Sequence, residues 1–474
     1  MSLQTTVGFD LTDMEAFAHH LRGEWNAEMA GPEGPWVARA AVPLDCMGGF
    51  AEYCGASTLA VPTSDFVCGA AQRRDDQQVQ VNLLLEGTNG HPHTVAVPLS
   101  AWYDVGGLAD AEVFRARLEE VAHAWARPAL GVLHEILSSG LAPHLGGGLN
   151  LALAAARSWE GDGRASVAAA AATIAAVCPV LGIEPSASEM ARRAGDSARH
   201  FLGLPCGFSS AMCALCGESG SLIRVRTQPQ EGSAPLALPK GIGFIGVDCE
   251  ARHPQAQRKF QEARTAAFMG RRIIERLLSA RSQSGDWGGY LARLSINDYV
   301  ESLRDRLPTK MKGREFVARF GPLDDAGCHV EEDAVYKIRS RTEHHIYENM
   351  RVHRFADRMS RAQRTGERGA LLEAGELMFA SHWSYGQRCG LGSIETDRLV
   401  NLLRQRGAGA GLFGAKISGC GAGGMVTVLL SDTETAHNAV RGAAEEYALA
   451  TGRTARIVLG TSDGALVHGV RRAC

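Results

Sequence analysis

A glycine-rich segment directly before an apolar run places the tightest constraint on how this chain folds. Residues 419–424 hold four glycines in six positions, and the apolar run Met425–Leu430 follows at once. Glycine has no Cβ atom, so it adopts positive φ angles and lets another backbone or a ligand approach closely. The segment therefore predicts a strand whose entrance faces either a ligand or a second backbone.

A second glycine-bearing segment precedes an alanine-rich run. Residues 158–166 have the sequence SWEGDGRAS, and VAAAAATIAAV follows. The first turn of a helix presents free N–H groups and the positive end of the helix dipole, which together bind anions. The segment is therefore either a phosphate-binding loop or a glycine turn before a helix that Ser166 caps. It is not a P-loop, because the GK[ST] element is missing.

A third segment combines a turn with the start of a helix. Residues 204–212 have the sequence LPCGFSSAM, in which Pro-Cys-Gly forms a turn and the following residues begin a helix. The N-terminal end of that helix faces an anion or a polar ligand, or it is an ordinary helix that begins after glycine.

The distribution of apolar runs indicates an α+β protein. Strand-like runs cluster in residues 36–81 and 221–248 and again near the C-terminus, and helical patterns separate the clusters without a strict alternation. A length of 474 residues allows two or three domains with large cores.

Charge and composition exclude several classes of protein. The net charge of −3 excludes a protein that holds nucleic acid by bulk positive charge. We expect no membrane segment, because the alanine-rich run 165–177 is short and weakly apolar and no leader-like segment is found. Twelve cysteines with one CxxC, Cys213 and Cys216, predict reduced and mostly buried thiols. We expect a cytoplasmic protein.

Taken together and in this order, the glycine-rich segments resemble the motifs of the GHMP small-molecule kinases. Within them, the chain is most similar to the galactokinase branch and to the kinase half of plant L-arabinokinases. The resemblance is carried by LDCMGGFAEYCGAS at 44–57, PCG at 205–207, VDCEARH at 247–253, HIYENMRV at 345–352, HWSYGQRCGLGS at 382–393 and GAKISGCGAGGM at 414–425.

The resemblance implies a two-lobed α+β fold with the active site in the cleft between the lobes. The N-terminal lobe would be 1–200 with its glycine loop at 159–166, and the C-terminal lobe 201–474 with its glycine motif at 419–424. It further implies ATP as phosphoryl donor, Mg²⁺, and a sugar phosphorylated at its anomeric hydroxyl. The expected partner is a small sugar-like substrate, and the expected state is a monomer or a homodimer.

The resemblance, together with the residues by which this chain departs from it, gives candidates for individual roles. The candidates for catalysis are Asp45, Glu52, Asp162 and Ser210, and those for metal binding are Ser166 and Glu160. The candidates for nucleotide binding are Gly161, Gly163, Arg164, Ser166, Gly419, Gly421 and Gly423. The candidates for sugar binding are Asp45, Glu52, Tyr53, Gly207, Asp248 and His253.

Three positions depart from the family pattern. Ser210 stands where the family has the aspartate that acts as base, Pro43 where it has an arginine, and Val167 where it has the hydroxyl that contacts Mg²⁺. A serine hydroxyl is not a base near neutral pH.

These departures leave three hypotheses open. The chain is a sugar kinase that uses Glu160 or Asp162 as base, or no base. Alternatively, it is a retooled enzyme acting on a sugar, a sugar phosphate or a nucleoside. The third hypothesis is a ligand-binding protein without catalysis.

Overall fold

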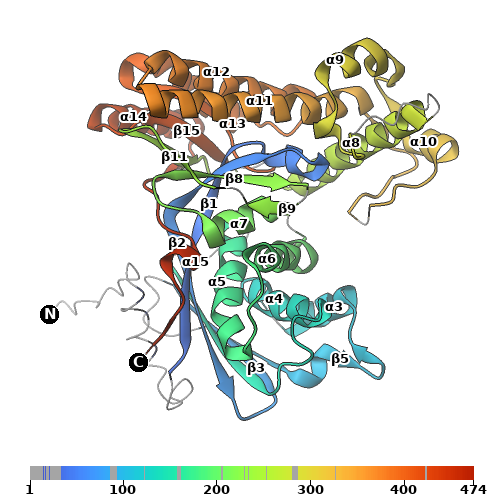
Figure 1. Cartoon of the computed structure of the whole chain (residues 1–474), viewed down its shortest axis with the longest axis vertical. Helices are drawn as coiled ribbons and strands as arrows, with labels where there is room; N and C mark the ends of the chain where they lie inside the picture. Colours follow the sequence, from blue (N-terminus) through green and yellow to red (C-terminus); the bar gives the residue numbers. More distant parts are fainter. Residues whose placement is uncertain are drawn as a thin grey trace. The chain divides into compact units, whose positions relative to one another are not determined.

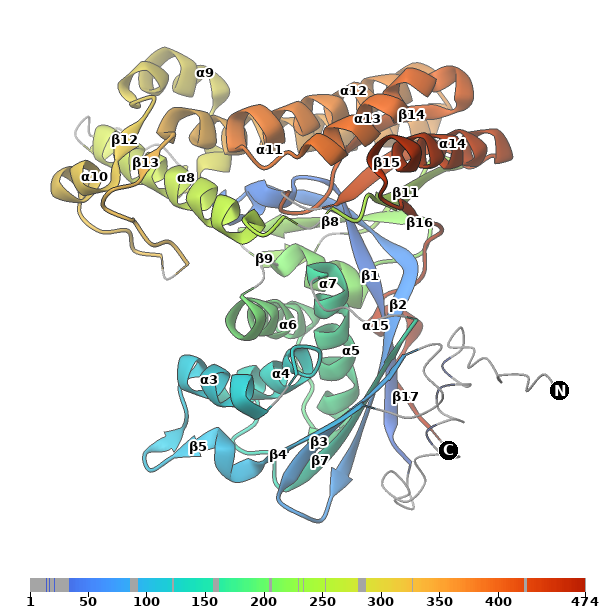
Figure 2. The same cartoon turned by 180° about the vertical axis from the view of Figure 1, so that it is seen from behind.

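The structure is a computed structural model in which strands and helices are mixed (Figures 1 and 2). The sheets and the helices that pack on them confirm the predicted α+β class. The structure describes Met14, Phe17 and Leu21 and the ranges 34–85, 93–121, 123–156, 162–203, 207–228, 230–232, 234–251, 253–279, 287–325, 327–421 and 424–473.

The chain forms two compact units, each built from separate stretches of sequence. Unit 1 comprises residues 1–43, 62–219 and 461–474, and unit 2 comprises 44–61 and 220–460. This division differs from the single boundary expected after residue 200. The divisions near residues 43 and 61 fall inside strands β1 (Trp36–Met47) and β2 (Thr58–Arg74), so residues 44–61 contribute to unit 2.

Unit 1 is a sheet with a layer of helices on one face (Figure 1). The strand order β2-β7-β3-β4 is antiparallel except for the parallel pair β3–β7, and the last strand, β17, pairs with the start of β1. The further strands are β3 (Gln78–Leu85), β4 (His93–Pro98), β5 (Tyr103–Asp104), β6 (Gly107–Leu108), β7 (Gly148–Ala155) and β17 (Arg471–Arg472). The helices are η2 (Leu99–Trp102), α3 (Ala111–Val121), α4 (Arg127–Ser138), α5 (Gly163–Leu181), α6 (Ala187–Leu202), α7 (Phe208–Cys216) and α15 (Ala465–His468).

Helix α5 is the alanine-rich helix that the sequence predicts, but it is longer than expected. Its 19 residues make it long and apolar enough to cross a membrane by length and composition, which corrects the expectation that this run is too short. Most of its side chains are buried inside the protein, as in the central helix of a folded core. Small alanine side chains let the neighbouring elements approach closely, and Gly69 of β2 sits directly against Ala172.

Unit 2 contains an antiparallel sheet with the strand order β14-β15-β11-β16. Alternate residues of β15 enter two different cores. Met425 and Leu429 join one core, and Val426 and Val428 join the other. Because both faces are buried, the strand has a continuous apolar sequence instead of an alternating one. The strands are β8 (Ser221–Thr227), β9 (Gln230–Gly232), β10 (Leu236–Ala237), β11 (Ile242–Asp248), β12 (Met311–Lys312), β13 (Val335–Tyr336), β14 (Leu412–Ile417), β15 (Met425–Ser431) and β16 (Arg456–Val458).

Long helices cover this sheet (Figure 2). Helix α12 crosses β14 at Gly375, where a Cβ atom would lie 1.9 Å from the Phe413 carbonyl oxygen, so only glycine allows this approach. All described helices of unit 2, short ones included, are η1 (Gly49–Cys54), α8 (Ala256–Ser279), η3 (Leu291–Arg293), α9 (Ile296–Asp298), η4 (Tyr299–Leu303), η5 (Arg304–Arg306), α10 (Gly313–Phe320), α11 (Ile338–Thr365), α12 (Arg368–Ser384), η6 (Tyr385–Cys389), α13 (Ile394–Arg406), η7 (Ala408–Ala410) and α14 (Glu434–Thr451).

Candidate functional site

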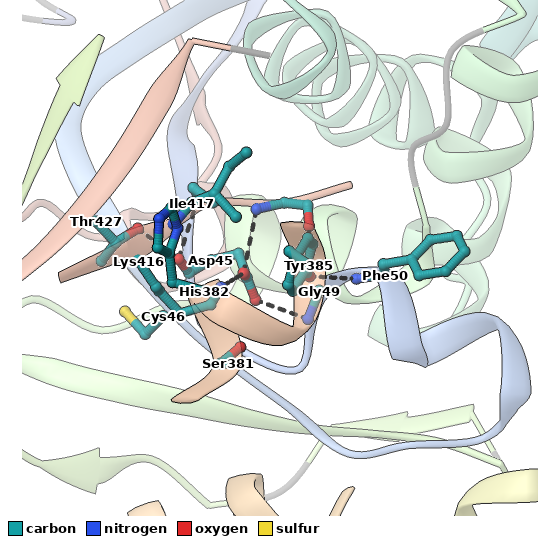
Figure 3. Close-up of polar contacts among 12 residues, drawn as sticks. Asp45, Cys46, Gly49, Phe50, Ser381, His382, Tyr385, Lys416, Ile417 and Thr427 are labelled. Carbon is teal, nitrogen blue, oxygen red and sulfur yellow. Dashed lines mark hydrogen bonds and ion pairs between the residues drawn. The ribbon is translucent and has the colours of Figure 1, made fainter. Parts of the chain in front are cut away.

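Asp45 is the centre of a polar cluster in unit 2 (Figure 3). Its neighbours in β1, Leu44 and Cys46, are buried in the core, while its own side chain keeps 13% exposure. One carboxylate oxygen accepts the Gly49 N–H at 3.0 Å. The other accepts the Lys416 ammonium at 2.8 Å and the Gly419 N–H at 3.1 Å. The carboxylate therefore joins the end of β1, the start of η1, β14 and the glycine-rich segment before β15. From here on, the name glycine loop refers to the described residues of that segment, 418–421 and 424.

The main chain of Asp45 is held as firmly as its side chain. Its carbonyl oxygen accepts the Ser418 hydroxyl at 3.1 Å and the Thr427 hydroxyl at 2.6 Å. Thr427 faces Asp45 because it lies on the same side of β15 as Met425 and Leu429. A polar residue in the apolar run of β15 thus has a specific partner.

Tyr385 makes the second link between η1 and the glycine loop. Its hydroxyl accepts the Phe50 N–H at 2.8 Å and donates to the Gly419 carbonyl at 2.8 Å. Gly49 lies beside it with φ +28°, and a Cβ atom there would meet the Tyr385 hydroxyl at 2.2 Å. Only glycine therefore fits between Asp45 and Tyr385 at position 49.

Lys416, like Tyr385, is a residue of this cluster to which the sequence alone assigned no role. Its side chain is fully buried, and its ammonium group also lies 5.0 Å from the centre of the Tyr385 ring. A lysine inside an apolar strand is the signal that could have revealed it, because a buried ammonium needs a carboxylate partner. We call Asp45, Tyr385, Lys416 and Gly419 the clasp.

The predicted sugar-side residues Glu52 and Tyr53 lie on η1. The Glu52 carbonyl accepts the Thr227 hydroxyl at 3.2 Å. The Tyr53 ring packs edge-on to Phe260, with a ring-centre distance of 5.4 Å, and under the guanidinium of Arg264 at 4.7 Å. Its hydroxyl lies 3.9 Å from the Cys420 sulfur atom of the glycine loop. Glu52 and Tyr53 thus share a helix that the clasp ties to the glycine loop.

Asp248 and His253 lie beyond the other end of the loop. Asp248 is buried at the end of β11, where it accepts the Glu250 N–H at 3.0 Å, and the Cys249 N–H bonds to the Gly424 carbonyl. His253 pairs with Glu395 at 3.2 Å. Although burial alone would raise the pKa of Glu395, its hydrogen bonds and the charge of His253 hold that pKa below its usual value.

Two buried histidines of α11, His344 and His345, pack beside the cluster. His344 bonds to the Ser384 hydroxyl at 2.9 Å, and burial lowers its pKa well below the ordinary value. His345 packs 4.9 Å from the Phe50 ring, and burial lowers its pKa to about 3. Both histidines are therefore neutral at physiological pH. Burial also raises the pKa of Tyr385 well above its ordinary value, which keeps its hydroxyl protonated and able to donate.

Of the predicted phosphate loop of unit 1, the structure describes residues 162–166, which form the N-terminal end of α5. The Asp162 carboxylate caps α5 by accepting the N–H groups of Arg164 at 3.0 Å and Ala165 at 3.4 Å. It also forms an ion pair with the Arg164 side chain at 2.8 Å. Ser166, predicted to cap this helix or to bind phosphate and metal, is buried in its first turn, and Gly163 is its first residue. The capping residue is therefore Asp162.

Gly207 and Ser210 lie at the start of α7. Gly207 precedes the helix in extended conformation, and Ser210 is the third helical residue, half-buried. Helices α5 and α7 pack against each other within unit 1. Ser210 stands where the family resemblance places an aspartate.

Three predicted residues, Glu160, Gly161 and Gly423, lie outside the described residues. Within the part of the chain that the structure describes, no three histidine, cysteine, aspartate or glutamate side chains gather as a metal site would require. Within unit 2, Asp45 bonds directly to Gly419, the Tyr53 hydroxyl lies beside Cys420, and Gly421 packs against the Tyr385 ring. Glu52 lies on η1 of the same unit. Asp162, Gly163, Arg164, Ser166, Gly207 and Ser210 lie on packed elements of unit 1.

Comparison with known proteins places this geometry in a family context. The family model described as GHMP kinases C terminal matches residues 366–449. L-arabinokinase of Arabidopsis thaliana is 28% identical over 490 residues, which cover 92% of this chain and 46% of that protein. The chain thus spans about half the length of this relative. Galactokinase of Chloroflexus aggregans is 25% identical over 62% of this chain and 64% of its own length.

The fold comparison agrees with the sequence comparison. The crystal structure of Lactococcus lactis galactokinase complexed with galactose superimposes with a TM-score of 0.70 at 15% identity, covering 96% of this chain and all of that chain. At this identity the likeness concerns the fold, and it confirms the GHMP kinase fold.

Proposed function

We propose that this chain, a member of the GHMP kinase family with galactokinase-like sequence, binds an arabinose- or galactose-like monosaccharide and phosphorylates its anomeric hydroxyl with ATP. The observation that carries the proposal is the clasp. It ties η1, to which the family resemblance assigns the sugar, to the glycine loop, to which it assigns the phosphates.

The sugar-binding part of the proposal rests on η1. Glu52 supplies a carboxylate that can accept sugar hydroxyl groups, and Tyr53 supplies a ring held in place by Phe260 and Arg264. Both carboxylate oxygens of Asp45 already accept N–H groups, so we assign Asp45 to the support of the site. The kinases named among the relatives suggest a pentose or a hexose.

The glycine loop leaves room for ATP to approach its backbone. A Cβ atom on Gly419 would meet nothing within 4 Å, so this part of the loop has open space beside it. The start of α5 fits a triphosphate poorly as it stands. Two of its N–H groups already bind the Asp162 carboxylate, which also repels phosphate. Nucleotide binding there requires Asp162 to turn away, with Arg164 supplying a positive charge.

The described residues do not form a magnesium site. Ser166 is 2% exposed, and no cluster of three ligands is found among the residues that the structure describes.

We expect these residues to promote phosphoryl transfer slowly, by holding the sugar and ATP in position for the reaction. Phosphoryl transfer needs mainly in-line alignment and neutralisation of charge, and little covalent help from the protein. The sugar hydroxyl loses its proton late in such a reaction. An enzyme with Ser210 in place of a carboxylate is then slow but not inactive.

Ligand binding without catalysis is the second candidate. Two observations favour it: Asp162 occupies the anion site of α5, and Ser210 replaces the base. In this case the protein binds a sugar, and phosphoryl transfer does not follow.

Thermal stability with single ligands, together with ATP consumption, separates the two candidates. A ligand that binds only the folded state at 100 times its Kd raises the unfolding free energy by about 2.7 kcal/mol. We expect arabinose or galactose to raise Tm, and ATP with Mg²⁺ and sugar to yield ADP and a sugar 1-phosphate. A rise in Tm with sugar but no ADP favours the binding protein. If no pentose or hexose raises Tm and none supports ADP formation, both candidates fail.

A further inference from the structure

We propose that Lys416 is a positioning residue that fixes the glycine loop and the start of η1 in a single geometry, acting through Asp45. The role of these two segments in ligand binding rests on the proposed function. The mechanical role of Lys416 rests only on the contacts within unit 2 (Figure 3).

The burial of Lys416 decides how it acts. Its side chain has no exposed surface, so no ligand touches it in this conformation. Its ammonium group has one carboxylate partner, Asp45, and one aromatic face, Tyr385, at 5.0 Å. Any effect of Lys416 on a ligand must therefore pass through these two side chains.

The Asp45 carboxylate depends on this ammonium group. It is mostly buried, and a buried anion without a cation is strongly destabilised. When Lys416 loses its charge, the carboxylate gains by turning toward water. The N–H groups of Gly49 and Gly419 then lose their acceptor.

Gly419 is the residue most sensitive to that loss. It has φ +63°, and no atom lies within 4 Å of the position that a Cβ would occupy. Its place is set by hydrogen bonds of its peptide groups, the N–H to Asp45 and the carbonyl to the Tyr385 hydroxyl. Tyr385 also bonds to Phe50, so a shift of its ring disturbs both segments.

The test compares Lys416→Met with a matched control variant of unit 2. Methionine keeps the approximate length of the side chain and removes the charge. Arg351→Met removes the cation of another buried pair, Arg351–Glu348, whose atoms are 2.7 Å apart and whose carboxylate also accepts the Ser381 hydroxyl. Both variants leave a buried carboxylate without its cation, so they control for general destabilisation.

Hydrogen exchange of the free full-length chain is the main measurement. In Lys416→Met we expect the amides of Gly49 and Gly419 to exchange about tenfold faster or more, because the acceptor that protects them is the charged Asp45 carboxylate. The Phe50 amide, which donates to the Tyr385 hydroxyl, is expected to exchange faster as well when that ring shifts. In Arg351→Met these amides keep their wild-type rates while residues near Glu348 exchange faster. Lys416→Arg restores the charge, and we expect it to recover most of the protection.

The thiol of Cys420 gives a second readout in the same loop. Its sulfur lies 3.9 Å from the Tyr53 hydroxyl, so its reaction with a maleimide, mapped by peptide mass spectrometry, reports on that contact. We expect faster labelling in Lys416→Met, and Cys420→Ala identifies the signal.

Two outcomes overturn the proposal. One is unchanged exchange at Gly49 and Gly419 in a folded Lys416→Met variant. The other is an equal acceleration in Arg351→Met, which would assign the effect to global stability. Neither readout needs a ligand, so a failure of the proposed function leaves this test intact. If the kinase is active, Lys416→Met raises KM for ATP more than Arg351→Met does.

Discussion

At the scale of single residues, we expect Ser210 to limit the rate of the proposed reaction. It occupies the third position of α7, half-buried, where the family resemblance places a carboxylate. The hydroxyl can bind a ligand but cannot take a proton near neutral pH.

Placing a carboxylate at position 210 therefore tests whether this position can hold the base of the proposed reaction. Ser210→Asp is expected to raise kcat for sugar phosphorylation by about 10²–10⁴-fold, the usual contribution of a general base. The measurement is ADP formation with arabinose and galactose. Ser210→Asn, which has the shape without the basic oxygen, serves as control. Equal rates for the two variants would contradict the assignment of this position.

His345 gives the protein a dependence on pH. Burial lowers its folded-state pKa from 6.5 to about 3, so only the unfolded chain takes up this proton between those values. Stability from this group is complete above the unfolded pKa and falls as the pH falls. Between pH 7 and pH 5 the loss for one such histidine is about 2 kcal/mol.

Replacing His345 by leucine removes this loss. We expect urea unfolding of His345→Leu to show a decrease between pH 7 and pH 5 that is about 2 kcal/mol smaller than in the wild type. His344 remains in both proteins and cancels in the comparison. The same pH dependence in both proteins would show that His345 takes up its proton at the same pH in the folded and the unfolded chain.

At the scale of elements, the start of α5 combines a structural role and the proposed ligand-binding role. Asp162 caps the helix, and the same N–H groups are the ones a phosphate would use. The stability of the helix and the affinity for an anion therefore oppose each other at one residue.

Two substitutions separate these roles. Asp162→Ala removes the cap and is expected to lower the unfolding free energy by about 1 kcal/mol. Asp162→Asn keeps a capping oxygen without the charge, so stability stays close to that of the wild type while ATP–Mg²⁺ raises Tm more. The check is thermal unfolding with and without nucleotide. If Asp162→Asn shows the nucleotide response of the wild type, the carboxylate does not control access to α5.

At the scale of the whole molecule, each unit depends on segments far apart in sequence. The C-terminal segment 461–474 belongs to unit 1, where β17 pairs with β1 at Trp36 and Val37. Gly464 of the same segment packs directly on the backbone of Leu215. We therefore expect the packing of unit 1 to depend on the segment 461–474.

Truncation after Gly460 tests this arrangement. We expect amide exchange to become faster at Trp36, Val37 and in α7, while β14 and β15 keep the rates of the full chain. The readout is hydrogen exchange of the truncated and complete proteins under identical conditions. A uniform acceleration in both units would instead show that the units unfold together.

The sequence alone predicted much of the fold because its signals are local. The alanine-rich run formed α5, the run 425–430 formed β15, and the α+β class was confirmed. Propensity and periodicity act between neighbouring residues, so they can be recognised without coordinates. The length of α5 and its cap by Asp162 could not be predicted from the sequence, because helix ends depend on individual hydrogen bonds.

What only the tertiary structure decided is how distant segments meet. The glycines at 419–424 and the acidic residues at 45 and 52 were candidates from the sequence, whereas the role of Lys416 was not predicted. Its partner Asp45 lies 371 positions away in the chain. A buried charge takes its meaning from the group it meets, and no local pattern encodes a contact across that separation. The units are discontinuous for the same reason: strand pairing, and not position in the chain, determines their membership.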